Sequence, residues 1–408
     1  MFFRVKIARF LLLLLRWRWL PAATRGARVV RMLEDMGLFF VKIGQIMSVQ
    51  YNMLPQAITD ELRRLQSAVA PGPTAVDVRD LALRGVVIEA GAAPFACGSV
   101  SCVFRGTYRG HDVAVKVVRA SAKSDIASTR QCMREAKWLV SWVPYRIVHK
   151  MARFLAVVID IMEAQIDLRN EVENWRRMHA AHGDAIVVPF VYEEVCDKDV
   201  LVMDYVDGHS VEDMRRIVAA APDPGAMYER VCDEMSTFMF DSALITRVYH
   251  ADMHPGNVFW RKSDGRLGLY DYGIVNEIDP ELARKIMCFY IHLFAGNVED
   301  MGASLAKLVY DENDLRPQLE ESITAALRER LGAAATGVQL VRHIQDIVVA
   351  ADARLNHDVT LININMLMLD NIMNRLGDEG YDAIATVKRH IMHHVVEGTI
   401  DIDAVLAS

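Results

Sequence analysis

One stretch of this chain constrains its fold and chemistry more than any other: His250-Ala-Asp252-Met-His-Pro-Gly-Asn257, followed fourteen residues later by Asp271-Tyr-Gly. Residues 257–271 read as two short apolar strands joined by a polar turn, which would hold Asn257 and Asp271 close together at one end of a hairpin. Magnesium prefers oxygen ligands, and an amide and a carboxylate supply them while leaving room for phosphate oxygens. Each piece alone is usually a turn. In this order and spacing, they predict a divalent-cation site.

A second strand, upstream, carries a lysine inside an apolar run, His111-Asp-Val-Ala-Val-Lys116-Val-Val. A buried ammonium is costly unless it pairs with a carboxylate or a phosphate. The best carboxylate is Glu171, in the charged segment 167–178, which lacks Gly and Pro and is predicted to be a helix. Without the lysine, that helix would be read as a solvated face. Kinases place such a lysine on the α- and β-phosphates and use an aspartate at the position of Asp252 as the catalytic base.

Two further segments predict contacts to a nucleotide. Residues 95–104 form a strand–turn–strand whose turn consists of small residues, as a phosphate-covering loop requires, although it is not a G-x-G-x-x-G. Residues 200–208 form an apolar strand ending in a polar turn, typical of a kinase interlobe hinge. The expected nucleotide-binding residues, apart from Lys116, are Ala96, Cys97, Gly98 and Ser99 in the turn, and the backbone of Asp204, Tyr205 and Val206 in the hinge.

Together these segments resemble the UbiB/ADCK atypical kinases, a coenzyme Q-linked, kinase-like family, over about residues 30–300. Lys42-Ile-Gly-Gln45 is similar to that family's N-terminal K-x-G-Q motif, and the turn at 96–99 to its alanine-rich loop. Gln165-Ile-Asp167 falls where the family has E-x-D, so Gln165 stands in place of a glutamate. In the alanine-rich loop, Cys97 and Gly98 replace alanines, and Gly98 makes the loop more flexible.

The resemblance implies an α+β, two-lobed protein-kinase-like fold with an N-terminal helical K-x-G-Q extension and a mostly helical C-lobe. The expected divisions are a basic leader at 1–31, the K-x-G-Q extension at 32–73, an N-lobe at 74–203 and a C-lobe at 204–408. It also implies that the K-x-G-Q helix covers the active site, with Lys42 and Gln45 restraining it near Gln165 and Asp167. Without the family context, Lys42 would be read as reaching solvent from an amphipathic helix.

The resemblance further implies an ATP- and Mg²⁺-dependent phosphotransferase or ATPase, with ADP as product. It would act at a membrane in support of coenzyme Q or related prenyl-lipid metabolism. The implied partners are membrane lipid, prenyl-quinone intermediates and coenzyme Q biosynthetic proteins. The implied locations are the mitochondrial inner membrane, a plastid or the bacterial cytoplasmic membrane. A non-catalytic, nucleotide-gated scaffold is the alternative. A true protein kinase is disfavoured, because Asp279-Pro280 starts a helical pattern soon after Gly273 and no A-P-E follows.

Charge is distributed unevenly along the chain, whose net charge is −7 with 24% charged residues. Residues 1–31 carry eight Lys or Arg and no acidic residue, around the apolar run Phe10-Leu-Leu-Leu-Leu-Leu15. That run is too short to cross a bilayer, which needs about 20 residues. An interfacial helix on anionic lipid, an organelle-targeting peptide and a packed N-terminal helix remain open. The acidic remainder is unlike a nucleic-acid-binding surface, so we expect no nucleic acid partner.

The cysteines and a group of histidines are further candidates for a metal site. Six cysteines are scattered without a C-x-x-C, which argues against a zinc site and predicts reduced thiols. His390, His393, His394 and Glu397 would lie close together on one helix. We interpret this group as a polar helix face rather than a metal site, because the sequence offers no further ligand nearby.

Overall fold

The computed structural model describes residues 27, 28, 30, 31, 33–35, 73–89, 92–98, 100–124, 126–128, 130, 131, 163–310, 316–331, 344, 346–348, 353–377, 381 and 383–406. The chain divides into two compact units. We call Met1–Glu173 with Pro189–Tyr205 the N-terminal unit, and Asn174–Val188 with Val206–Ser408 the C-terminal unit. The sequence did not indicate that residues 174–188 group with the C-terminal unit. The fold is the mixed α/β, kinase-like fold that was expected, with an antiparallel sheet in the N-terminal unit.

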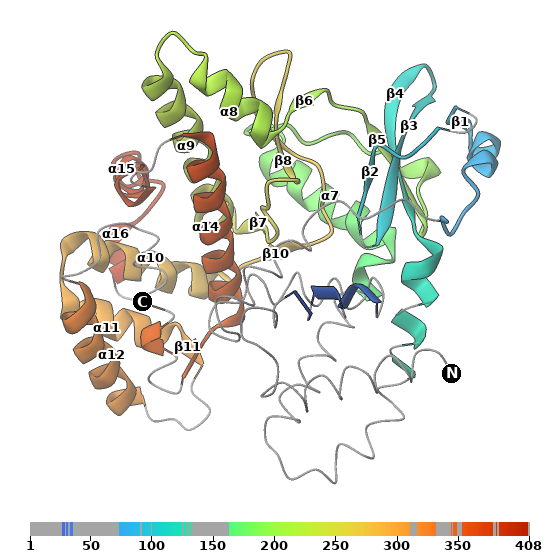
Figure 1. Ribbon diagram of the computed structural model, residues 1–408. Helices are drawn as coiled ribbons and strands as arrows, with labels where there is room; N and C mark the ends of the chain where they lie inside the picture. The colour runs from blue at the N-terminus through green and yellow to red at the C-terminus, as the bar shows by residue number, and fades with distance from the viewer. Residues whose placement is uncertain are drawn as a thin grey trace. The chain divides into compact units, whose positions relative to one another are not determined.

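The N-terminal unit is built on an antiparallel sheet with strand order β1-β3-β4-β5, and β2 pairs with β3 (Figure 1). The strands are β1 (Val86–Val87), β2 (Ala96–Cys97), β3 (Ser101–Tyr108), β4 (His111–Val118) and β5 (Val200–Asp204). The core of the unit gathers valines of β4 and β5 with Leu81 of the 3₁₀ helix η3 (Val78–Arg84). The β3–β4 turn needs two left-handed residues, Arg109 (φ 51°) and Gly110 (φ 82°), as a tight hairpin turn does. This turn sets the register that pairs Val103 with Lys116.

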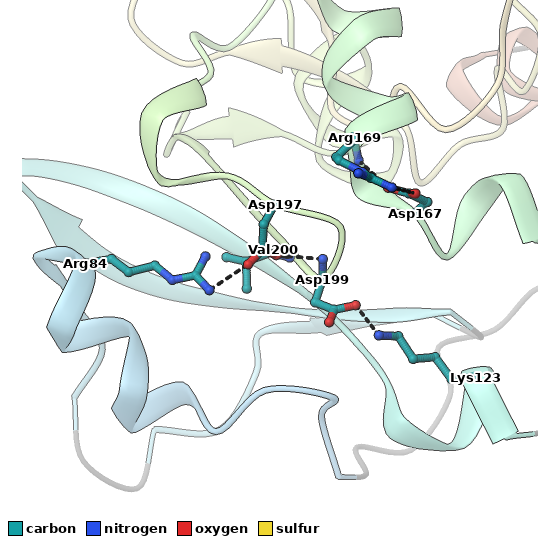
Figure 2. A network of polar contacts seen from close by, with 7 residues as sticks. All are labelled: Arg84, Lys123, Asp167, Arg169, Asp197, Asp199 and Val200. Atoms are coloured by element: carbon teal, nitrogen blue, oxygen red, sulfur yellow. Dashed lines mark hydrogen bonds and ion pairs between the residues drawn. The ribbon is translucent and has the colours of Figure 1, made fainter.

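The turn at 197–199 connects three parts of this unit (Figure 2). Asp197 accepts hydrogen bonds from the N–H groups of Asp199 (2.7 Å) and Val200 (2.9 Å), and its Oδ2 pairs with Arg84 at 2.6 Å. The carbonyl of Lys198 accepts the N–H of Leu168 at 3.0 Å, at the first residue of helix α7 (Leu168–His182). Asp199 pairs with Lys123. The turn therefore links η3 to β5 and fixes where α7 begins.

A disulfide joins Cys97 to Cys102, so the prediction that all the cysteines are reduced thiols is wrong for this pair. The two residues face each other in the β2–β3 register, with Cα atoms 4.2 Å apart. Their spacing in the sequence gave no sign of this, because only the tight turn between the strands brings them together. Cys196, Cys232 and Cys288 are free thiols.

The C-terminal unit is mainly helical, and α14 packs against α8 and α9 while α15 runs beside α9 (Figure 1). Its helices are α8 (Val211–Ala219), α9 (Pro224–Phe240), the π-helical turn η5 (Asp241–Ile245), α10 (Pro280–Ala295), α11 (Val298–Lys307), α12 (Arg316–Leu331), α14 (His357–Leu376), α15 (Ala383–Val396) and α16 (Ile402–Leu406). Its strands are β6 (Gly208–His209), β7 (Val248–His250), β8 (Val258–Arg261), β9 (Leu267–Leu269), β10 (Val275–Glu277), β11 (Val309–Tyr310) and β12 (Arg354–Leu355). They form the sheets β6-β8-β9, β7-β10 and β11-β12. The helical pattern expected over 281–408 is confirmed for the described residues, with the β11–β12 pair as an insertion.

Several of the sequence predictions concern residues outside the described set. They include most of the basic leader, the K-x-G-Q residues Lys42 and Gln45, and Ser99 of the phosphate-covering turn. Among the residues that the structure describes, no helix has the length and apolar character needed to cross a bilayer.

We expect Asp197→Ala to lower the free energy of unfolding by about 1–3 kcal/mol, because it removes the acceptor of two backbone N–H groups and the partner of Arg84. Burial raises the pKa of Asp197, but the hydrogen bonds from Asp199 and Arg84 outweigh it and hold that pKa below its usual range. A depressed carboxyl pKa contributes stability above the unfolded-state pKa, and this contribution is lost as the pH falls through the folded-state pKa. The difference between wild type and variant should therefore shrink below about pH 4.

Urea unfolding monitored by circular dichroism at pH 7 and pH 3 measures this difference. Asp112→Ala is the matched control, because the Arg105–Asp112 pair on the same sheet is exposed and should contribute little. Equal stability of wild type and Asp197→Ala at pH 7 would show that the turn is not a structural link.

Candidate active site

The expected lysine–glutamate pair is present in the N-terminal unit. Lys116 Nζ lies 2.7 and 2.8 Å from the two carboxylate oxygens of Glu171, and the residues are 8% and 4% exposed. Lys116 comes from the middle of β4, between Val103 on β3 and Leu201 on β5. Glu171 comes from the first turn of α7. Desolvation makes a buried charge costly unless it is compensated at close range, so the pair fixes both elements.

The turn after β2 carries the residues expected to cover phosphates. Ala96 and Cys97 lie in β2, and the N–H of Gly98 donates to the carbonyl of Ser101 at 2.9 Å. The carbonyl of Gly98 accepts Arg119 Nη1 at 3.1 Å. Arg119 is 6% exposed, and this burial lowers the pKa of its guanidinium. Arg119 was not predicted, because its only signal in the sequence is a cation directly after the apolar strand β4.

The hinge residues Asp204 and Tyr205 end β5 and leave it. The N–H of Asp204 donates to the carbonyl of Phe190 at 2.8 Å, and the N–H of Tyr205 donates to that of Asp112 at 3.0 Å. These two donors are therefore committed within the N-terminal unit. Of the three hinge residues expected to contact adenine, Val206 is therefore the one whose backbone N–H could donate to it.

The loop predicted to be catalytic, residues 250–257, lies in the C-terminal unit and is organised around His250; we refer to it as the catalytic loop. Its Nδ1 accepts the N–H of Asp252 at 3.2 Å, and its Nε2–H donates to the carbonyl of Asp271. These two contacts assign the tautomer. His250 is 1% exposed, and burial lowers its pKa, so the ring stays neutral near pH 7. The sequence motif contains His250, but its role as the bridge between Asp252 and Asp271 was not predicted.

The predicted hairpin is confirmed as β8 and β9, with Val258 opposite Leu269. Asn257 Nδ2 donates to the carbonyl of Asp252 at 2.9 Å, which leaves the amide oxygen as the group to hold a cation. Asp271 Oδ1 accepts the N–H of Gly273 at 2.7 Å. The N–H of residue 270 donates to the carbonyl of Asn257 at 3.0 Å, which ties the two predicted metal ligands to adjacent strand ends. The donor set is the hard oxygen type that suits Mg²⁺. Among the described residues, the Asp252 carboxylate has no hydrogen-bond or ion-pair partner.

A buried asparagine of α14 supports the same loop from far along the chain. Asn365 Oδ1 accepts the N–H of Met253 at 3.2 Å, and its Nδ2 donates to the carbonyl of His250 at 2.6 Å. Asn365 is 1% exposed. Its amide therefore replaces water for two backbone groups that flank Asp252. Asn365 was not predicted, although a polar residue at a core-facing position of an apolar helix is a signal in the sequence.

Only five residues separate Gly273 from the cap of the next helix. Within them, β10 pairs antiparallel with β7, placing Val275 opposite His250. Asp279 then caps α10 by accepting the N–H groups of Glu281 and Leu282, with Pro280 at the first helical position, as the sequence predicted. This part of the C-terminal unit therefore has no long segment of the kind on which protein kinases dock a peptide.

The residues at the E-x-D position lie in the N-terminal unit. Asp167 pairs with Arg169, whose Nε lies 2.9 Å from Oδ1. Gln165 Oε1 is buried without a hydrogen-bond partner. Their expected proximity to Lys42 stays a prediction, because Lys42 lies outside the described residues. The predicted site residues as a whole divide between the units: Lys116, Glu171 and the 96–98 turn in one, and Asp252, Asn257 and Asp271 in the other.

The chain is similar in sequence to curated proteins. A probable protein kinase UbiB of Pseudomonas fluorescens (strain Pf0-1) is 32% identical over 305 residues, which are 68% of this chain and 55% of the relative. The corresponding protein of Pseudomonas aeruginosa (strain LESB58) is 33% identical over 302 residues, with the same coverage. The chain thus spans about half the length of the curated relatives it matches.

A solved structure shares the fold: the complex of Rv3197 with erythromycin from Mycobacterium tuberculosis, with a TM-score of 0.53 and 18% identity, covering 86% of this chain and 91% of that one. A family model described as the ABC1 atypical kinase-like domain matches residues 87–305, more than half of the chain. That span contains the Lys116–Glu171 pair, the catalytic loop and the hairpin. The chain belongs to the ABC1 atypical kinase-like family.

Proposed function

We propose that this protein binds ATP with Mg²⁺ and transfers or hydrolyses the γ-phosphoryl group. The observation that carries the proposal is the buried ion pair of Lys116 and Glu171, with Nζ–O distances of 2.7 and 2.8 Å. The carboxylate holds the ammonium at a fixed place in the middle of β4. In kinases a lysine held by a glutamate in this way contacts the α- and β-phosphates of ATP.

Each polar group of the site has a defined task in this proposal. Lys116 neutralises charge on the α- and β-phosphates, and Glu171 keeps the ammonium in place. Asn257 and Asp271 would hold Mg²⁺, which would supply positive charge to screen the phosphoryl group. Asp252 accepts the proton of the attacking hydroxyl or water, and its carboxylate has no competing partner among the described residues. His250 and Asn365 position the loop without touching the nucleotide.

We infer that the phosphoryl acceptor is not a docked peptide, although the relatives are named probable protein kinases. The short connection through β10 supports this inference, because it offers no extended segment for a substrate chain. A membrane-associated role in coenzyme Q or related prenyl-lipid metabolism rests on the UbiB name of the relatives and on the basic leader. A nucleotide-gated scaffold without turnover is the alternative, and the replacement of a glutamate by Gln165 favours it.

We expect Asp271→Asn to weaken ATP binding at least about tenfold in Mg²⁺ and about twofold or less in EDTA, because it removes a charged ligand of the cation. Isothermal titration of the full chain measures both affinities. Asp264→Asn is the matched control, since Asp264 lies in the turn of the same hairpin and pairs with Arg261. Wild type and Asp271→Asn binding ATP equally in Mg²⁺ would refute the metal assignment. Wild-type binding without ATP turnover, with or without lipid vesicles, would favour the scaffold.

We expect Asn365→Leu to lower the free energy of unfolding by about 2–4 kcal/mol, because it leaves the N–H of Met253 and the carbonyl of His250 buried without partners. Hydrogen exchange of the loop peptide around Met253 should accelerate, and ATP turnover should fall. Asn374→Leu, on the same helix but exposed, should change neither property. Unaltered loop exchange in Asn365→Leu would mean that α14 does not support the loop.

We expect the full chain to bind vesicles containing anionic lipid, and added salt to weaken the binding. Each cation of residues 1–31 near such a surface contributes about 1 kcal/mol, and salt screens this attraction. Co-sedimentation of the full chain and of a chain lacking residues 1–31 measures the effect. Equal sedimentation of the two would show that the leader does not make the proposed membrane contact, and would have no bearing on the proposed nucleotide site.

A further inference from the structure

Three side chains from two separate elements of the C-terminal unit, none of them among the predicted nucleotide- or metal-binding residues, converge at one place. Asp241 begins the π-helical turn η5, and His390 and His394 lie one helical turn apart on α15. Their ligand atoms, Asp241 Oδ1 and the two Nε2 atoms, all lie within 4.8 Å of one another. We propose that these three residues bind a divalent transition-metal ion, with Zn²⁺ as the representative species.

The distances within the cluster fit a coordination shell. His390 Nε2 and His394 Nε2 are 3.0 Å apart, and Asp241 Oδ1 lies 3.1 Å from His394 Nε2 and 2.6 Å from His390 Nε2. Ligand atoms at bond lengths of about 2.0–2.2 Å are separated by about 3.3 Å around a tetrahedral ion and about 2.9 Å around an octahedral one. Two of the three separations lie in this range. A small rotation of the partly exposed Asp241 carboxylate brings the third into it.

Hydrogen bonding alone satisfies this cluster poorly. If both imidazoles carry a proton on Nε2, two N–H groups 3.0 Å apart must share one carboxylate oxygen, with their hydrogens close together. A cation lets both nitrogens and the carboxylate oxygen act as electron-pair donors toward one point. His394 Nδ1 is buried without a hydrogen-bond partner. Among the described residues, no donor to Nδ1 therefore holds the proton of this imidazole on Nε2, the atom that faces the cluster.

The backbone presents these ligands in a fixed way. The turn η5 closes with the N–H of Thr246 donating to the carbonyl of Asp241 at 2.9 Å, and such π-helical turns often occur at functional sites. Asp233, eight residues before Asp241, accepts hydrogen bonds from Thr386 (2.7 Å) and Arg389 (3.3 Å) on α15. This contact docks α15 on α9, and the two helices lie side by side in Figure 1.

The donor set defines the class of ion. Two imidazoles and one carboxylate are typical of sites for Zn²⁺ and other first-row divalent metals, whereas Mg²⁺ prefers oxygen ligands alone. Three protein ligands also leave at least one position for water. His393 and Glu397, which the sequence placed with these histidines, instead pair with each other at 3.2 Å on an exposed face. The helix therefore has one histidine pair for the ion and one exposed histidine that serves as an internal control.

The test uses the full chain, purified without an oligohistidine tag and stripped with EDTA. We expect one Zn²⁺ per chain by calorimetry and elemental analysis in the absence of nucleotide. Asp241→Asn, His390→Gln and His394→Gln should each raise the Kd at least about a hundredfold, since loss of outer partners alone commonly costs 10–100-fold. His393→Gln should bind as the wild type does. Asp271→Asn should also retain the ion, which separates this site from the proposed Mg²⁺ site.

Two measurements on the wild type decide the question even where a variant fails to fold. Co²⁺ bound at the site should give visible d–d absorption with the intensity of an imidazole–carboxylate complex, and Zn²⁺ should displace it. Zn²⁺ at about a hundred times its Kd should raise the melting temperature by about 5–10 °C. Absence of these signals, or equal binding by the three ligand variants and the wild type, would overturn the proposal. The cluster would then be a hydrogen-bonded contact between α15 and η5 only.

Discussion

A buried ammonium in the middle of a β-sheet is the constraint on which the N-terminal unit depends. Lys116 can occupy its place in β4 only because Glu171 meets it at hydrogen-bond distance. Glu171 in turn depends on where α7 begins, and the carbonyl of Lys198 fixes that start. Asp197 shapes the turn that presents this carbonyl. The position of the Lys116 charge therefore depends on the start of α7 and on the turn before the edge strand β5. The contacts that connect them are short and polar, and tolerate little displacement.

The C-terminal unit solves a different problem, which is to hold an irregular loop without regular backbone pairing. The side chains of His250 and Asn365 satisfy backbone groups on both sides of Asp252, and the β7–β10 pair anchors the start of the loop. The Asp252 carboxylate is left without a partner among the described residues. Rigid support around an unpartnered carboxylate fits the role of base that we propose for Asp252, because a base must be placed accurately while it stays free to accept a proton.

The features that local sequence predicts are those whose partners lie nearby. The β8–β9 hairpin, the cap at Asp279 and the lysine strand each follow from a pattern a few residues long. The Lys116–Glu171 pair was predicted across a longer distance, because a lysine in an apolar strand demands a carboxylate. Asn365, the Cys97–Cys102 pair and Asp241 were not predicted. Their roles follow only from which chain segments meet in three dimensions, and neither polarity nor spacing encodes that meeting.

The support that Asn365 gives to the loop has a consequence for the order in which the protein matures. Asn365 follows His250 by 115 residues, so a growing chain exposes the loop long before its partner exists. Because chains fold from the N-terminus as they are made, the sheet around Lys116 can form while the loop still depends on water for its hydrogen bonds. The loop becomes rigid only once α14 has been synthesised and has docked. Synthesis of α14 therefore sets the moment at which a nascent chain acquires a supported loop, and a chain terminated before Asn365 would lack that support.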